Sequence, residues 1–255
     1  MIIGRGKRLF LYLPYMWSFY TRHKTPLNKV SFFMVDIFPS LFFAYIYNSD
    51  FIEYVLAFTF MYCLYEIGYI SNDVVSVMNE SKPTYRINEN DLPYVRKNLY
   101  GIILIRLILA MFIGYTIIIG YNANVSYFLC FGCALLLAYY LHNHFRGRIN
   151  IVTMFGVVFL KYFIPISIVL RSTKDIENCM LIIILAIVLP RVIEYTAKKK
   201  FFPIVHIRNI HKMRLMYMLF LFLLLLVSGC NNEYFIFICL LLFYRCICYV
   251  YVFRS

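Results

Sequence analysis

Few residues of this chain carry a charge, and acidic residues are the scarcest among them. Charged residues make up 15% of the 255 positions, and only 12 residues are Asp or Glu. Soluble domains contain about 25% charged and about 45–50% apolar residues, whereas 63% of this chain is hydrophobic. The composition therefore excludes an ordinary soluble domain. Because aromatic residues make up 20% of the chain, it also excludes an intrinsically disordered protein.

The sequence also lacks the short motifs that mark many soluble enzymes. It contains no GxGxxG, phosphate-loop, HExxH or GxSxG pattern, which argues against soluble nucleotide-binding enzymes and proteases. Most of the cysteines lie within apolar runs, where a cysteine is expected to act as a small buried hydrophobic residue rather than in a disulfide or as a metal ligand. These are Cys63, Cys130, Cys133, Cys239, Cys246 and Cys248.

What the sequence does contain is a series of long apolar runs. A helix needs about 20 mostly apolar residues to cross the hydrocarbon core of a bilayer. The runs predict an all-α integral membrane protein, a bundle of about eight transmembrane helices that forms one polytopic domain over residues 1–255. The sixth run is short and is expected to tilt or to continue past Pro190. The predicted spans are 29–48, 51–71, 99–120, 124–141, 149–169, 179–190, 214–229 and 235–252.

The basic residues indicate how the spans are oriented. With the N-terminus inside, the inner segments hold most of the Lys and Arg residues, whereas the outer loops hold only Arg171 and Lys174. Inner loops are usually the basic ones, so both termini are predicted to be cytoplasmic. The net charge of +13 then requires no nucleic-acid partner, and it adds an attraction to anionic lipid heads.

Residues 1–28 have some features of a signal peptide but lack others. Basic residues precede an apolar stretch, but the stretch contains Pro14 and Trp17, and no small-residue cleavage site follows it. We interpret these residues as a retained cytoplasmic segment that lies at the inner membrane interface.

Five ionisable residues fall inside the predicted spans, although each costs about 2.5–3.5 kcal/mol at the bilayer centre. One interpretation is that the arginines reach toward the interface and the acids pair with them as structural links. The other is a polar cavity open to the cytoplasm, which the gathering of these charges favours. The five residues are Asp36, Glu66, Arg106, Lys161 and Arg245.

Glu66 begins a stripe of oxygen-bearing side chains. Asp73 follows it by seven residues and therefore shares its helix face, which continues through Ser76 to Glu80. Carboxylate oxygens at this spacing suit a hard cation such as Mg²⁺. The alternative is a solvated helix end, where Asn, Asp and Ser are common.

Residues 65–80 resemble the first signature of the UbiA superfamily of membrane prenyltransferases, which is N-D-x-x-D-x-x-x-D at the end of the second span. Asn72 and Asp73 match this signature, whereas Ser76 and Glu80 replace its later aspartates. The residues that follow, from Lys82 to Arg86, resemble the basic loop of the family.

The second, Asp-rich signature of that family is absent. In its place, residues 189–195 are similar to the K-R-x-x-E type sequence of the branch that transfers phosphoribose to a polyprenyl phosphate, with Arg191 and Glu194 at the matched positions. Arg146 and Arg148 occupy the place of the family's basic loop between spans four and five. The chain departs from the family in having eight predicted spans rather than nine, and in its lost aspartates.

The resemblance implies a transferase that acts on an isoprenoid lipid in a bacterial inner membrane. It would move a polyprenyl group to an acceptor, or a phosphoribosyl-type group to a polyprenyl phosphate, with Mg²⁺-assisted loss of diphosphate. It further implies that the loops at 72–86 and 191–200 meet over one cavity. The alternatives are a non-catalytic carrier or transporter of lipid phosphates, and a structural subunit with the same fold.

The resemblance also implies roles for individual residues. Asp73 would be the main metal ligand, with Glu80 second and Ser76 weak, and Asn72 would orient them. Glu66 would ligate or orient, or only pair with Arg106. Every basic residue in these loops also serves the orientation of the spans, and Lys198, Lys199 and Lys200 are assigned to that role alone. The implied phosphate contacts are Lys82, Arg86, Arg146, Arg148 and Arg191, with Glu194 beside them.

Overall fold

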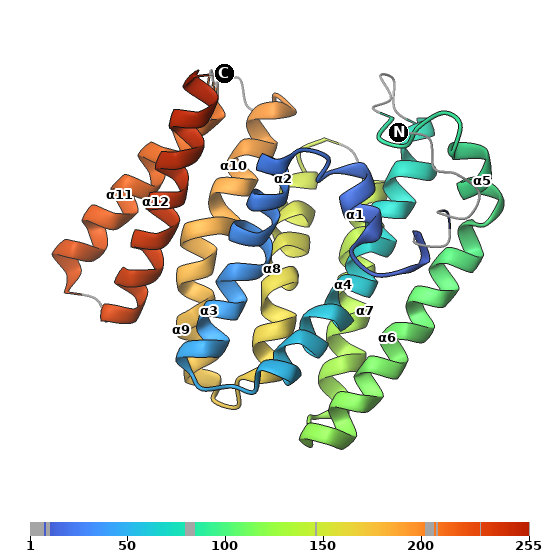
Figure 1. Cartoon of the computed structure of the whole chain (residues 1–255), viewed down its shortest axis with the longest axis horizontal. Coiled ribbons are helices and arrows are strands. Elements are labelled where there is room, and N and C mark those ends of the chain that lie inside the picture. Colours follow the sequence, from blue (N-terminus) through green and yellow to red (C-terminus); the bar gives the residue numbers. More distant parts are fainter. Residues whose placement is uncertain are drawn as a thin grey trace.

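The computed structural model describes residues 8, 11–79, 85–145, 147–201, 207, 209–229 and 231–254. Every regular element within these ranges is a helix (Figure 1). The elements are α1 (Met16–Thr21), α2 (Pro26–Ser31), η2 (Phe32–Ile37), α3 (Phe38–Ile46), α4 (Phe51–Val74), η3 (Ser76–Asn79), α5 (Leu92–Lys97), α6 (Leu99–Tyr121), α7 (Val125–His144), α8 (Asn150–Val169), α9 (Thr173–Ile183), η4 (Ile184–Val188), α10 (Leu189–Lys198), α11 (Ile210–Ser228) and α12 (Asn232–Arg254).

Eight helical segments of the described chain are long and apolar enough to cross a bilayer, which confirms the predicted number. Their surfaces are apolar as well. Along α6, for example, Leu104, Ile108, Met111, Phe112 and Tyr115 are all exposed, as expected for side chains that contact lipid rather than water. The segments are Pro26–Ile46, Phe51–Met78, Leu99–Tyr121, Val125–His144, Asn150–Val169, Thr173–Lys198, Ile210–Ser228 and Asn232–Val252.

The sixth span differs most from its predicted bounds. The run at 179–190 was expected to tilt or to continue past Pro190; the helix does continue past Pro190, to Lys198, and it begins earlier than expected, at Thr173. Ser172 caps its start by accepting a hydrogen bond from the backbone N–H of Asp175. The charged residues at both ends therefore belong to helix rather than to loop.

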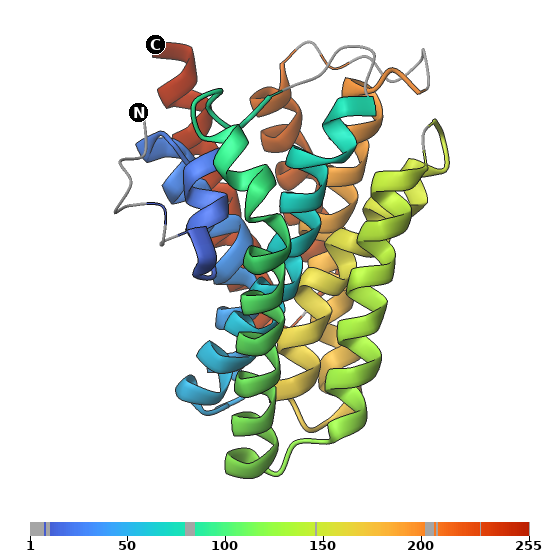
Figure 2. The same ribbon diagram turned by 90° about the vertical axis from the view of Figure 1, so that its right-hand side faces the viewer.

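Helix α4 lies at the centre of the bundle and packs against α6, α7 and α8. Figure 2 shows these long helices running along a common axis. Helices α11 and α12 pack chiefly against each other at one edge (Figure 1) and join the rest through α3, η4 and α10. We call the end of the bundle where α1, α5 and the C-terminal ends of α10 and α12 lie the α1 end (Figure 1).

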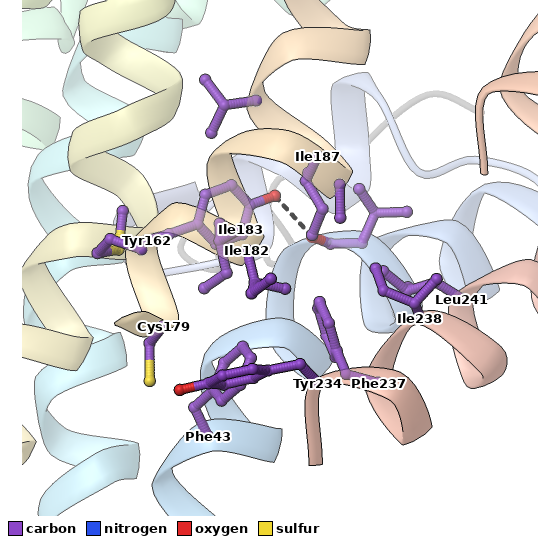
Figure 3. Packing of buried hydrophobic residues seen from close by; sticks show 14 of the residues in the cluster. Phe43, Tyr162, Cys179, Ile182, Ile183, Ile187, Tyr234, Phe237, Ile238 and Leu241 are labelled. Carbon is purple, nitrogen blue, oxygen red and sulfur yellow. Dashed lines mark hydrogen bonds between the residues drawn. The ribbon is translucent and has the colours of Figure 1, made fainter. Parts of the chain in front are cut away.

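The edge pair α11–α12 is held by a cluster of large apolar side chains. Phe237 and Ile238 of α12 and Ile187 of η4 are almost completely buried in it (Figure 3). Phe43 of α3 also belongs to the cluster, and its ring centroid lies 4.9 Å from that of Phe237.

Two π-helical turns interrupt the spans, and each precedes a proline. Pro39 has no N–H to offer the carbonyl of Val35, which instead accepts a hydrogen bond of 2.6 Å from the hydroxyl of Tyr162. The turn at η4 precedes Pro190, and there the hydroxyl of Tyr217 donates to the Leu185 carbonyl at 2.8 Å. Tyrosines on neighbouring helices thus satisfy backbone groups that the prolines leave open.

Candidate functional site

The N-terminal segment (residues 11–25) is folded into the α1 end of the bundle. Leu11 and Trp17 are completely buried, and they pack with Ile70, Val74 and Ile102 of α4 and α6. Residues 1–28 were predicted to lie at the membrane interface. The prediction does not hold for this part of the segment, which belongs to the protein core.

Glu66 and Arg106 form an ion pair that is fully buried. Arg106 donates to the Glu66 carboxylate at 2.6 Å, and neither side chain has any exposed surface. The backbone N–H of Ser18 donates to the same carboxylate at 2.7 Å, and Arg106 donates to the carbonyls of Leu11 and Leu13 at 2.9 Å. Glu66 was expected to ligate a metal, to orient other ligands or only to pair with Arg106, and the structure shows the pairing with Arg106. The pair also ties the N-terminal segment to α4 and α6.

Asp73 lies on the same face of α4 and is surrounded by hydrogen-bond donors. Arg22 binds both of its oxygens, at 2.7 and 3.0 Å. Arg86 donates to one of them at 3.0 Å, and the Trp17 indole donates to the other at 3.0 Å. Asn72 approaches at 3.5 Å. The carboxylate is therefore held between two guanidinium groups.

This arrangement does not fit a protein-held Mg²⁺. A cation at Asp73 would have to displace two arginines and then lie beside their charges. Within the described ranges no three His, Cys, Asp or Glu side chains gather as metal ligands do. Ser76 is buried in η3, and Glu80 lies outside the described residues. We therefore derive no step that passes through a metal ion.

A polar pocket of about 240 Å³ lies beside Asp73 at the α1 end. The loops that follow α4 and the end of α10 meet over it, although more than a hundred residues separate them in sequence. Among the described residues, its cationic side chains are Arg22, Arg86 and Lys199, and no carboxylate lines it. The remaining lining residues are Tyr65, Tyr69, Asn72, Val77, Tyr139, His142, Asn143, Asn150, Met154, Val157 and Tyr195.

The wall formed by α7 and α8 carries hydrogen-bonding atoms that have no protein partner. Among the described residues, nothing donates to the buried Oδ1 atoms of Asn143 and Asn150. The amide of Asn143 is oriented by a hydrogen bond from its Nδ2 to the Gly68 carbonyl at 3.1 Å, so its oxygen remains available. A buried acceptor without a donor is costly, and a ligand with hydroxyl groups would supply the donors.

A second, larger cavity of about 890 Å³ lies on the other side of Arg86. Lys24, Lys29 and His23 line it together with aromatic side chains. Arg86 lines both cavities.

The surroundings of the N-terminal segment shift the pKa values of two of its residues. Burial is the largest single effect on the pKa of Arg22 and lowers it, but the charge and hydrogen bonds of Asp73, together with Tyr69 and Tyr139, outweigh burial and raise the pKa. Burial lowers the pKa of His23, against the opposing effect of the Asp36 carboxylate. Arg22 is therefore a permanent cation, and His23 is neutral at pH 7.

The other expected phosphate contacts lie elsewhere. Arg191 reaches Asp36 at 3.8 Å, and Glu194 accepts a bond of 2.6 Å from Arg214. Neither residue lines the pocket, nor does any of the five charged residues predicted inside the spans. Arg148 is exposed in the α7–α8 connection. Lys82 and Arg146 lie outside the described residues.

Of the residues that line this pocket, sequence reasoning had proposed only Asn72 and Arg86 for the site. Arg22 was one of the basic residues of the inner segments, and Lys199 was assigned to orientation alone. The spacing of Lys199 four residues after Tyr195 and eight after Arg191 could have indicated a shared helix face. No sequence signal links Arg22 to Asp73, 51 residues away.

Comparison of the chain with protein-family models, with curated proteins and with solved structures finds no match. The fold and the site therefore define the class of the protein: an all-α polytopic membrane protein with a cationic pocket at one end of its bundle.

Gly68 allows α7 to approach α4 where the pocket is formed. A Cβ atom at this position would lie 2.1 Å from Cγ of Tyr139, near the base of that side chain. We expect Gly68→Ala to force α7 away and to destabilise the protein by about 1–3 kcal/mol. Thermal unfolding in detergent measures the effect. Gly156→Ala, where a Cβ would meet nothing within 4 Å, is the matched control, and an equal loss in both variants would contradict the packing argument.

Proposed function

We propose that this protein is a membrane transferase that joins a phosphorylated sugar to an isoprenoid lipid phosphate, with the reacting phosphate groups bound in the pocket beside Asp73. The resemblance to the UbiA superfamily supports the transferase class, and its phosphoribosyl branch supports the direction of transfer. The single observation that carries the proposal is a pocket lined by three cations and by two amide oxygens that have no donor among the described residues.

The cations of the pocket suit phosphate groups. Arg22 and Arg86 offer planar guanidinium donors, which bind phosphate oxygens in pairs. Their positions are held by Asp73, so little side-chain entropy remains to be lost when a ligand binds. Lys199 adds a mobile point charge from α10.

The amide oxygens of the pocket suit the hydroxyl groups of a sugar. Asn143 and Asn150 present acceptor oxygens without donors, which a prenyl diphosphate lacking hydroxyl groups would leave unsatisfied. This favours a sugar diphosphate as donor over simple prenyl transfer.

The reaction would be a displacement at the anomeric carbon of the sugar. An oxygen of the lipid phosphate forms a bond to that carbon while the bond from the carbon to the diphosphate breaks, and the diphosphate leaves with the electron pair. Negative charge grows on the departing oxygens, and the cations of the pocket would stabilise it. The resemblance also implies Mg²⁺ as a cofactor, but the described side chains offer it no site, so the three cations carry this role in the proposal.

The test is binding and turnover by purified protein in bicelles. Offered polyprenyl phosphate and phosphoribosyl diphosphate, the protein should form the lipid-linked sugar phosphate, detected by mass spectrometry. Lys199→Gln should weaken phosphoribosyl diphosphate binding about tenfold, the equivalent of about 1.4 kcal/mol. Lys212→Gln, a change at an exposed residue of α11, should leave binding unchanged. A prenyl diphosphate with an aromatic acceptor, offered in parallel, should give no product, and product there alone would reverse the assigned direction.

The second candidate is a non-catalytic carrier of lipid phosphates. The engagement of both Asp73 oxygens by arginines favours it, because the residue matched to the metal ligand of the family is already neutralised. Binding of polyprenyl phosphate without turnover in either assay would assign the protein to this candidate. Absence of both binding and turnover would reject the lipid-phosphate proposal altogether and leave the structural-subunit alternative.

The proposal requires the α1 end to face the cytoplasm, with both termini inside. In a cysteine-free variant, Asn231→Cys in the α11–α12 connection should react with a membrane-impermeant maleimide added to intact cells. Lys198→Cys should react only after the membrane is opened. Labelling of residue 198 in intact cells would refute this orientation.

A further inference from the structure

Charged side chains of α10 and α11 meet deeper in the bundle, away from the pocket. Arg214 of α11 is paired with Glu194 of α10. Arg191 of α10 reaches Asp36 at 3.8 Å, and that carboxylate already holds Lys161 at 2.7 Å. The two carboxylates are therefore fully used by three cations.

Arg245 of α12 adds a fourth cation to this layer. It exposes only 7% of its surface. Within the described part of the chain its guanidinium makes no ion pair or hydrogen bond, and its Nε is buried without a partner. Its charge lies 5.1 Å from the centre of the Tyr244 ring. Arg191 and Arg214 repel it, and Glu194, which attracts it, is already paired with Arg214.

The layer thus contains two more positive than negative charges. An uncompensated charge inside a bilayer is costly, about 2.5–3.5 kcal/mol even on the mildest scales. Snorkelling cannot remove this cost for Arg245, because the side chain is covered by protein. A phosphate group placed among the three arginines would reduce this excess by one charge as a diester, and by up to two as a free ion or monoester.

We propose that Arg191, Arg214 and Arg245 form a second anion-binding site, which takes a phosphate group. Guanidinium groups from three helices suit the several oxygens of a phosphate. The phosphate can belong to the head of an anionic membrane lipid or to a free phosphate ion. The site is independent of the proposed transferase function, because none of the three arginines lines the pocket beside Asp73.

The edge position of α11 and α12 gives a lipid a way to this site. Among the described residues, the pair makes its main contacts with the bundle through α3, η4 and α10, so a lipid head could enter between α10 and α12 from the surrounding leaflet. In this arrangement the bound phosphate would link helices that otherwise share few contacts.

The experiment measures thermal unfolding of the full chain in nanodiscs of phosphatidylcholine alone, with added phosphatidylglycerol, or with added inorganic phosphate. The wild-type melting temperature should rise when an anion is supplied. Arg245→Met should lose most of that rise. In phosphatidylcholine alone, the same variant should melt at or above the wild type, because it removes an uncompensated buried charge. Lys212→Gln, on the exposed face of α11, should respond as the wild type does.

The outcomes separate the sources of the phosphate. A rise with phosphatidylglycerol alone assigns a lipid ligand, and a rise with inorganic phosphate assigns a free ion. A wild type that responds to neither, or an Arg245→Met variant that is destabilised equally in all three media, would overturn the proposal. If that variant does not fold, Arg245→Lys keeps the charge but loses the fork of donors, and it should reduce the wild-type response. None of these measurements involves transfer, so their failure is distinct from failure of the proposed function.

Discussion

Replacing Asp73 by Asn should destabilise the protein by about 3–5 kcal/mol, the cost typical of removing one partner from a buried ion pair. The substitution is nearly isosteric, but it leaves Arg22 and Arg86 without the carboxylate that both bind. Urea unfolding in mixed micelles measures the loss. Glu177→Gln, which removes an exposed acid of α9, should cost less than about 0.5 kcal/mol.

The same variant distinguishes an ion-pair role from a metal-binding role. If Asp73 positions the two arginines, Asp73→Asn and Arg22→Gln should be coupled, so that the double variant loses less stability than the two single losses added together. Mg²⁺ should then stabilise wild type and variant equally. Stabilisation by Mg²⁺ of the wild type alone, without coupling to Arg22, would return Asp73 to the metal-ligand role that its sequence motif implies.

Replacing Glu66 by Gln should release the N-terminal segment from the bundle. The change leaves the completely buried Arg106 without a counter-charge, which should cost about 3–5 kcal/mol. The N–H of Ser18 also loses an ionised acceptor. We expect trypsin to cleave the variant rapidly at Arg22, which in the wild type is held against Asp73. Gel analysis of timed digests is the measurement.

A paired replacement is the informative control for Glu66. In Glu66→Leu with Arg106→Leu no charge is left alone, so stability should return toward that of the wild type. Cleavage at Arg22 should nevertheless remain fast, because the bonds from Arg106 to the Leu11 and Leu13 carbonyls are gone. A double variant that resists trypsin as the wild type does would show that the ion pair does not hold the segment.

The number of spans could be predicted from the sequence because each span needs its own apolar run, and composition alone reveals such runs. The sequence also suggested that the sixth span continues past Pro190, but not where it ends, since helix α10 runs on through basic residues to Lys198 once its other face is buried. The π-helical turns before Pro39 and Pro190 also have no clear sequence signal, because the hydroxyls that bond to their carbonyls come from tyrosines far away in the sequence.

The candidate site was predictable only where one helix supplies its residues. The seven-residue spacing placed Glu66 and Asp73 on one face of α4, and both side chains do meet the N-terminal segment. The partners of these acids come from other elements, and their distances in sequence follow no period. The loops around 72–86 and 191–200 were expected to meet because of a family resemblance, and their shared pocket has a different set of cations from the one expected.

The Glu66–Arg106 pair also constrains the order of events during synthesis. The N-terminal segment leaves the ribosome first, but its carbonyls at Leu11 and Leu13 bind Arg106, 95 and 93 residues later. At about 5–20 residues per second, the 40 residues between Glu66 and Arg106 take about 2–8 s to make. During that interval Glu66 of α4 has no Arg106 to pair with, and the N-terminal segment cannot form its bonds to Arg106. Docking of the N-terminal segment is therefore a late step, which requires α6 to be in place.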